Sequence, residues 1–201
     1  MQDRDRAPAG MAAQIGPSLP GRPLTQTRLS ATSLRRSARR CPPARRESRE
    51  ALHDQTVALM NAGAMMDDVL HTVRAPAHLL DRPYLTPIYD EPEFIVRNLW
   101  RLYAGWWDGD PARLKPAPAA ALAVELADLA GGARRLAARA EHLAERGDLA
   151  LACHLAERAA QAAPADDAVV TVRASVYARR AERETSLMAR GLYRWAADRK
   201  R

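Results

Sequence analysis

Helical periodicity in the second half of the chain is the feature that most restricts its fold. From Ala119 onward, apolar and small residues recur at the spacing of one helix face almost without interruption. Alanine and arginine dominate the composition and aromatic residues make up only 5% of the chain, a mixture that favours thin, closely packed helices. The sequence therefore predicts an all-α fold, a helical bundle.

Residues 133–166 match the pattern of a tetratricopeptide unit, in which two helices pack through large and small side chains at fixed positions. The matching positions are Leu136, Ala140, Leu143, Ala152, Ala159 and the terminating Pro164. Gly147 and Asp148 fall at the turn between the two helices, and a second unit that starts at Asp167 keeps only its first half. Because one and a half units cannot bury a continuous core, we expect one tetratricopeptide-like helix pair that packs against other helices or a partner.

Basic charge is concentrated at the start of the chain. Residues 1–46 contain ten arginines, two aspartates and no sustained helical or strand period, so we expect a disordered tail there and one helical domain over residues 47–199. Residues 47–201 carry 21 basic and 22 acidic side chains, which gives no electrostatic reason to bind nucleic acid. The tail itself is open to three interpretations: a basic interaction tail, an organelle-targeting peptide or a non-structural leader.

The sequence shows no membrane span and no readable signal peptide. No apolar run approaches the roughly 18 to 20 residues that a span requires. Cys41 lies in the expected tail and Cys153 on a helical pattern, so a disulfide between them would stabilise the fold little. We therefore expect a cytoplasmic protein that does not associate with membranes.

The segment of residues 89–117 holds three of the four tryptophans and carries signals for both ends of a helix. Asp90 is a good N-cap with Glu93 in the capping-box position, and Gly109 with Pro111 supplies the stop. Its apolar residues form two neighbouring stripes, Ile95, Leu99, Leu102, Tyr103 and Trp106 on one and Val96, Trp100 and Trp107 on the other. An apolar arc this wide needs two neighbouring helices, or one neighbour and a second chain.

We expect this segment to provide an interface in a homodimer, with Trp100, Tyr103 and Trp107 as interface residues and Trp100 or Trp107 buried between the chains. Packing in the chain's own core and a platform for a sugar or lipid are the alternatives. Upstream, short helices are expected around Leu52 to Met60 and over residues 64–73, followed by an irregular passage that Pro76, Pro83 and Pro87 interrupt.

Motifs for catalysis or metal binding are not found. The five histidines, His53, His71, His78, His142 and His154, lack the tight pairing of a catalytic metal site, so we expect no metal ligand and no catalytic residue in this chain. The segment from His53 to Thr56 has the chemistry of a helix cap, and support of a neighbouring site is its functional alternative.

Four segments resemble a known family. They are LHDQTVALMNAG at 52–63, YLTPIYDEPEFIVRNLWRLYAGWWDGDPARLKP at 84–116, ELADLAGGARRLAARAEHLAERGDLALACHLAERAAQAAP at 125–164 and MARGLYRWAA at 188–197. Together they are similar to the dimerisation domain of the alkyl sulfatases, enzymes with a metallo-β-lactamase catalytic domain. The resemblance covers residues 48 to 199, and the segments containing HDQT and residues 89–116 are its most specific parts.

The resemblance implies an α-helical domain that joins two chains of a sulfuric ester hydrolase, which uses two zinc ions to hydrolyse primary alkyl sulfates such as dodecyl sulfate. The family's H-x-H-x-D-H motif would precede the HDQT segment, where this chain has the Arg/Pro-rich tail, so no zinc ligand is carried over. The family also directs a histidine and an aromatic residue of this region toward the sulfate, and the matching positions here are Phe94 and Trp106. Phenylalanine cannot donate a proton or hydrogen-bond a sulfate.

Three hypotheses follow. The first is a truncated dimerisation domain that is not catalytic alone and forms a homodimer. The second is a component of a split alkyl sulfatase that works beside a separately encoded metallo-β-lactamase catalytic domain. The third is a tetratricopeptide-like adaptor, which would be a monomer with a concave groove for a peptide.

Overall fold

The computed structural model describes residues 43–81, 85 and 87–199. The expected all-α fold is confirmed, since the described residues form helices, turns and loops and none of them forms a strand. Most of the expected tail, residues 1–42, lies outside the described residues.

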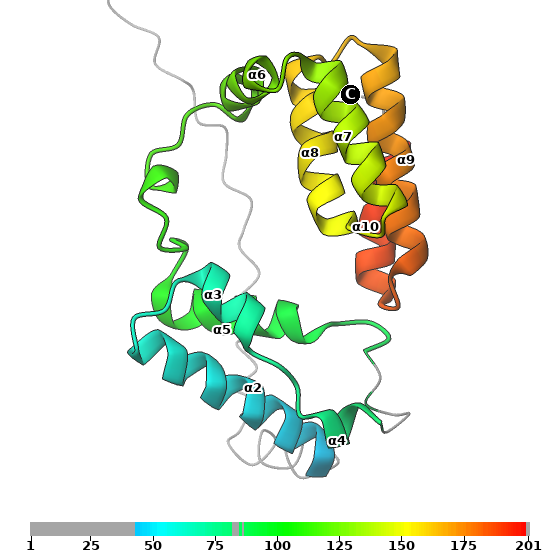
Figure 1. Ribbon diagram of the computed structural model, residues 1–201. Coiled ribbons are helices and arrows are strands. Elements are labelled where there is room, and N and C mark those ends of the chain that lie inside the picture. Colours follow the sequence, from blue (N-terminus) through cyan, green and yellow to red (C-terminus); the bar gives the residue numbers. More distant parts are fainter. Residues whose placement is uncertain (1–42, 82–84, 86, 200–201) are drawn as a thin grey trace, which may run out of the picture. The chain divides into compact units, whose positions relative to one another are not determined.

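Ten helical segments are assigned along the described residues (Figure 1). They are α2 (Pro43–Asn61), α3 (Met66–Thr72), α4 (Ala77–Leu80), α5 (Pro92–Ala104), the 3-10 turn η2 (Pro111–Arg113), α6 (Ala119–Leu129), α7 (Ala133–Glu145), α8 (Leu149–Ala162), α9 (Asp167–Arg183) and α10 (Leu187–Asp198). Helix packing falls into two groups, one made by α2, α3 and α5 and the other by α6 to α10.

Two boundaries near the start of the chain differ from the sequence expectation. The first helix begins at Pro43, before the expected domain start at residue 47, because a proline in the first helical turn sacrifices no hydrogen bond that the helix needs. The passage expected to be irregular contains the short helix α4, which starts directly after Pro76 and buries Leu79. Here too a proline precedes a helix instead of excluding one.

The first group is held together by one apolar core. Helix α2 contributes Leu52, α3 contributes Val69 with Val73 just beyond it, and α5 contributes Val96 and Trp100. All five side chains are at most 8% exposed. Burial of each such side chain contributes about 1.5–3 kcal/mol relative to an exposed one, so this core is what keeps three rather short helices together.

Helices α7 and α8 form the helix pair expected from the 34-residue pattern. The residues at its large and small positions are buried: Leu136, Ala140, Leu143, Ala152 and Ala159. The chain turns between the helices at Gly147, whose φ of +90° favours glycine, and α8 ends at Ala162, before Pro164. The helix pair is therefore present, while its kinship with tetratricopeptide repeats stays a prediction.

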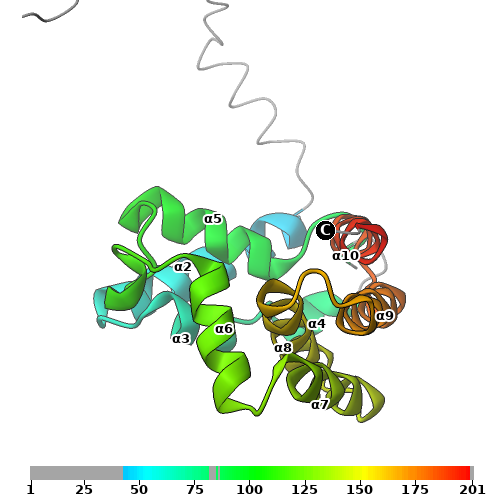
Figure 2. The same ribbon diagram turned by 90° about the horizontal axis from the view of Figure 1, so that it is seen from above.

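Helices α9 and α10 extend this pair into a bundle in which α9 packs on both α7 and α8 (Figures 1 and 2). Arg173 of α9 is only 4% exposed, and its guanidinium donates hydrogen bonds to α8 and α10. Its Nε donates to Glu157 of α8 at 2.7 Å, and one terminal nitrogen donates to the carbonyl of Ala196 in α10 at 2.8 Å. Tyr177 stacks under the guanidinium and donates its hydroxyl hydrogen to Glu157. One buried cation thus joins three helices.

Candidate functional site

Helix α5 divides into a buried face and an exposed face, and this division differs from the two stripes read from the sequence. Val96 and Trp100 face the core, whereas Leu102 is 71% exposed and Tyr103 is 56% exposed. In the stripe that also contains Ile95, Ile95 packs against the same core, and the C-terminal part formed by Leu102, Tyr103 and Trp106 is exposed. The sequence pattern identified both stripes but not which of them the neighbouring helices would cover.

Both ends of α5 also differ from expectation. The N-cap is Glu91 and not Asp90, because Pro92 occupies the first helical position and Asp90 turns its carboxylate toward the Glu91 backbone N–H instead. The helix ends at Ala104, before the expected stop at Gly109, since Gly105 adopts φ +80°. Trp106 and Trp107 consequently lie in the loop after the helix.

Hydrogen bonds from two tryptophans fix this loop. The indole N–H of Trp100 donates to the carbonyl of Trp107 at 2.9 Å, and the indole N–H of Trp107 donates to the carbonyl of Asp110 at 3.0 Å. The carbonyl of Asp108 accepts from the backbone N–H of Met66, which attaches the loop to α3. The loop is thus a defined structure, although most of its side chains are exposed.

Two aspartates complete the loop. Asp108 accepts from the backbone N–H of Asp110 at 3.1 Å and from the guanidinium of Arg113 at 2.7 Å, while Asp110 caps the η2 turn at the Ala112 N–H. The backbone hydrogen bond from Asp110, followed by the Arg113 contacts, lowers the pKa of the Asp108 carboxyl. Gly109 is buried and has φ +94°, a backbone conformation that favours glycine. A Cβ added at this position would overlap the Met65 sulfur.

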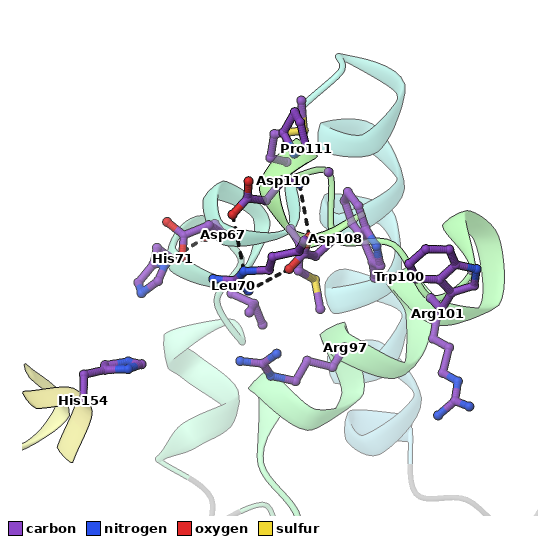
Figure 3. Close-up of a pocket in the computed structure, with 16 residues that line it drawn as sticks. Asp67, Leu70, His71, Arg97, Trp100, Arg101, Asp108, Asp110, Pro111 and His154 are labelled. Carbon is purple, nitrogen blue, oxygen red and sulfur yellow. Dashed lines mark hydrogen bonds and ion pairs between the residues drawn. The ribbon is translucent and has the colours of Figure 1, made fainter. Parts of the chain in front are cut away.

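An open pocket lies beside this loop, lined by side chains of α3, α5 and the loop and by His154 of α8 (Figure 3). Asp67 and His71 of α3 pair with each other, as Asp108 and Asp110 pair with Arg113. Arg97 and Arg101 of α5 also line the pocket, and the structure records no hydrogen bond or ion pair for either among the residues it describes. These two guanidinium groups, together with the imidazole of His154, are polar groups of the pocket for which the described residues provide no recorded partner.

The HDQT segment lies in the middle of α2 and not at a helix start, so its expected capping role is wrong. Gln55 instead bonds both the N–H and the carbonyl of Arg74, and thereby attaches α2 to the residue after α3. His53 contacts the Tyr103 hydroxyl through Nε2 and the Asp54 carboxylate through Nδ1, each at 2.9 Å. His53 thus links α2 to α5, while the alternative that the segment supports a neighbouring functional site stays a prediction.

The predicted site residues fall into two environments. Trp100 is 8% exposed and packs in the core of its own chain. Trp106, Tyr103 and Trp107 are 75%, 56% and 39% exposed respectively. Phe94 is half-buried in the first turn of α5.

Two basic residues of the pocket were not singled out by sequence reasoning. They are Arg97 and Arg101. Their spacing of four residues places both on the same side of α5, and the sequence could have shown this.

Metal-binding and membrane-spanning features are not found in the part of the chain that the structure describes. Among the described residues no group of three or more histidine, cysteine or carboxylate side chains is placed to hold a metal ion. No helix within that part of the chain is long and apolar enough to cross a membrane. Cys153 is the one cysteine described, and burial raises the pKa of its thiol to about 11, which keeps the thiol protonated and unreactive near neutral pH.

Comparisons with known proteins agree on one family. A family model described as alkyl sulfatase dimerisation matches residues 65–201. A linear primary-alkylsulfatase of Pseudomonas sp. is 37% identical over 105 residues, which are 52% of this chain and 20% of that protein. An alkyl/aryl-sulfatase of Saccharomyces cerevisiae is 32% identical over 103 residues, 51% of this chain and 16% of that protein. The chain thus spans about a fifth or less of the length of these relatives.

A solved structure has the same fold. The stereoselective inverting sec-alkylsulfatase Pisa1 from Pseudomonas sp. superposes with a TM-score of 0.70 at 23% identity, over 77% of this chain and 24% of that one. Identity this low supports a shared fold and no more.

Proposed function

The chain belongs to the alkyl sulfatase dimerisation family, and from this premise we propose that it assembles two copies of itself through the end of α5. We define the aromatic surface as Leu102, Tyr103, Trp106 and Trp107. The observation that supports the proposal is the exposure of these four large side chains, which runs from 39% to 75%. Large apolar side chains gathered at one exposed place are typical of protein interfaces.

The rigidity of this surface supports an interface over a loosely packed segment. Hydrogen bonds fix both the backbone and the side chain of Trp107, since its carbonyl accepts from the Trp100 indole and its own indole donates to the Asp110 carbonyl. Tyr103 is fixed through its hydroxyl contact with His53. Side chains held in one geometry lose little conformational entropy on association, so more of the contact free energy contributes to binding.

Phe94 and Trp106 also bear on the second partner that the family suggests. The residues matched make up only 20% and 16% of the relatives named as alkylsulfatases, so we propose that the hydrolysis of a sulfate ester requires a catalytic region that this match does not include. By the family resemblance that region would supply two zinc ions, and Phe94 and Trp106 would lie toward its substrate at the edge of the contact between the two copies. Whether the region belongs to the same protein or to a separate one, the role proposed for these helices is to hold it in a dimer.

The oligomeric state of the full chain tests the proposal. We expect a dimer in sedimentation velocity at micromolar concentration, and dissociation of that dimer when Leu102→Glu or Trp106→Glu places a charge in the aromatic surface. The matched control is Leu129→Glu on α6, because Leu129 is 86% exposed and lies in the other helix group.

The outcomes separate function from location. A dimer that survives the α5 variants but dissociates with Leu129→Glu would keep the function and move the interface to α6. A wild-type chain that stays monomeric at high micromolar concentration would contradict the proposed function itself.

A further inference from the structure

The exposed face of α5 carries charges in an order that suits a second copy of the same helix. Asp90 and Glu93 lie at its N-terminal end, and Arg97 and Arg101 lie in its C-terminal half. All four residues are exposed. None of them makes an ion pair that the structure records among its described residues, although Glu93 and Arg97 stand four residues apart, where such a pair forms readily.

Two apolar residues accompany the charges on the same face. Phe94 and Leu102 stand eight residues apart, so they lie on one side of the helix two turns from each other. Asn98 lies between them. The exposed face of α5 is therefore acidic and aromatic at one end, carries an amide in the middle, and is basic and aliphatic at the other end.

This order is self-complementary under a two-fold axis. When two identical helices pack antiparallel, residues equally distant from the axis on opposite sides come together. With the axis beside residue 97, Glu93 meets the Arg101 of the other copy, and this contact occurs twice. Phe94 lies within one helical turn of the position opposite Leu102 of the other copy. Arg97 faces its own counterpart across the axis, so two opposite-charge contacts stand against one like-charge contact. A parallel arrangement in register would instead place all three charged residues beside like charges.

We propose that α5 pairs with α5 of a second copy in this antiparallel register, with Glu93 and Arg101 as the specificity-determining ion pair. This inference rests on the proposed function and names the partner face and its orientation. The register also brings the exposed Trp106 of one copy near the exposed Ile88 and Tyr89 of the other, which precede α5. Apolar ends then flank a charged centre, as at interfaces whose charges set orientation and whose apolar contacts supply affinity.

Charge reversal in the full chain tests the register. Glu93→Arg places two like charges opposite each other at each end of the helix pair, and so does Arg101→Glu, so we expect each single variant to weaken the dimer at least about tenfold. The Glu93→Arg/Arg101→Glu double variant regains the opposite-charge contact in reverse, and we expect its dissociation constant to return to within about threefold of wild type. Sedimentation equilibrium measures all four constants.

Mixing the two single variants, Glu93→Arg and Arg101→Glu, gives a sharper test. Each homodimer is repelled at both ends, whereas the mixed dimer has opposite charges at both ends. At one end the substituted position 93 of the first copy faces the substituted position 101 of the second, and at the other end both partners keep their wild-type residues. The mixed dimer should therefore predominate in native mass spectrometry. Circular dichroism of each variant checks folding, and Glu93→Gln with Arg101→Gln replaces any reversal variant that fails to fold.

Acidic residues at the start and basic residues near the end of a helix also favour the helix dipole within one chain. If that were their only role, charge reversal would lower the melting temperature without changing association, and no preference for mixed dimers would appear. A wild-type dimer with that behaviour would overturn the inference and leave the proposed function standing. A wild-type monomer would overturn both.

Discussion

The indole N–H of Trp100, a residue of the α5 core, donates a 2.9 Å hydrogen bond to the backbone carbonyl of Trp107 in the exposed loop. One side chain therefore connects the part of α5 that stabilises the fold with the part that we assign to assembly. Trp106 lies between them in sequence and is 75% exposed, so the three tryptophans of this segment do three different things.

Replacing Trp100 by phenylalanine should destabilise the chain and loosen the loop. The variant leaves the Trp107 carbonyl without its donor and shortens a core side chain, so we expect a loss of about 1–3 kcal/mol in the free energy of unfolding. Urea denaturation followed by circular dichroism measures it. Trp106→Phe is the matched control and should change stability by less than about 0.5 kcal/mol. Equal losses in both variants would contradict the assignment of Trp100 to the core.

Alanine at Gly109 should be harmful for two reasons, of which alanine at Gly105 shares only one. Both glycines have positive φ, which costs an alanine about 1–2 kcal/mol, but a Cβ at Gly109 would also overlap the Met65 sulfur, whereas one at Gly105 meets nothing within 4 Å. We therefore expect Gly109→Ala to lower the melting temperature more than Gly105→Ala does. Adding Met65→Ala should recover part of the difference; no recovery would show that the overlap is relieved in another way.

The buried Arg173 should matter far more than an exposed arginine with an equally short contact. Arg173→Ala removes the buried cation that donates to Glu157 and to the Ala196 carbonyl, so we expect a loss of about 3–5 kcal/mol in the free energy of unfolding, or failure to fold. Arg134→Ala removes a 2.6 Å ion pair with Asp166, but the Arg134 side chain is 77% exposed, so water and salt screen the pair and the variant should lose only a small part of that stability. Similar unfolding free energies for the two variants would contradict the joining role of Arg173.

Acid should selectively remove the contribution of Asp166. The hydrogen bond from Arg134 lowers the pKa of the Asp166 carboxyl below the value of about 3.9 that it has in the unfolded chain. A lowered pKa in the folded state means that the stabilisation is present above about pH 4 and is lost as the pH falls through the folded pKa. The melting temperature of Asp166→Asn should therefore lie below wild type at about pH 6 and approach it as the pH falls through the folded-state pKa of Asp166. A constant difference across this range would show that the capping of α9 by Asp166 does not depend on its charge.

The sequence was sufficient for the helix pair because its signals are local. Alternating leucines and alanines identify the faces of α7 and α8, and Gly147 marks the turn, so neighbouring residues alone determine the outcome. The same reasoning could not decide α5. Two apolar stripes compete there, and only the tertiary positions of Leu52 and Val69 determine that Val96 and Trp100 are the covered ones. Its C-terminus was misplaced because Gly105 and Gly109 are equally good stops, and the first one takes effect.

Sequence reasoning could not separate the buried members of the tryptophan cluster from the exposed ones. Trp100 and Trp107 were both predicted as interface residues, but Trp100 is only 8% exposed and packs in the core of its own chain. The sequence pattern alone cannot distinguish a tryptophan that packs in the core from one whose side chain faces solvent. Arg97 and Arg101 were overlooked because an isolated basic pair on a helix is ordinary until its lack of partners among the described residues is seen in three dimensions.

The loop that carries Trp106 owes its shape to hydrogen bonds that mostly span no more than seven residues, from Trp100 to Trp107, from Trp107 to Asp110 and from Asp108 to Arg113. Each of these bonds closes a short segment of chain, so ordering the loop costs less conformational entropy than joining distant segments would. The exposed indole of Trp106 is thus carried on a backbone that its sequence neighbours largely hold in place.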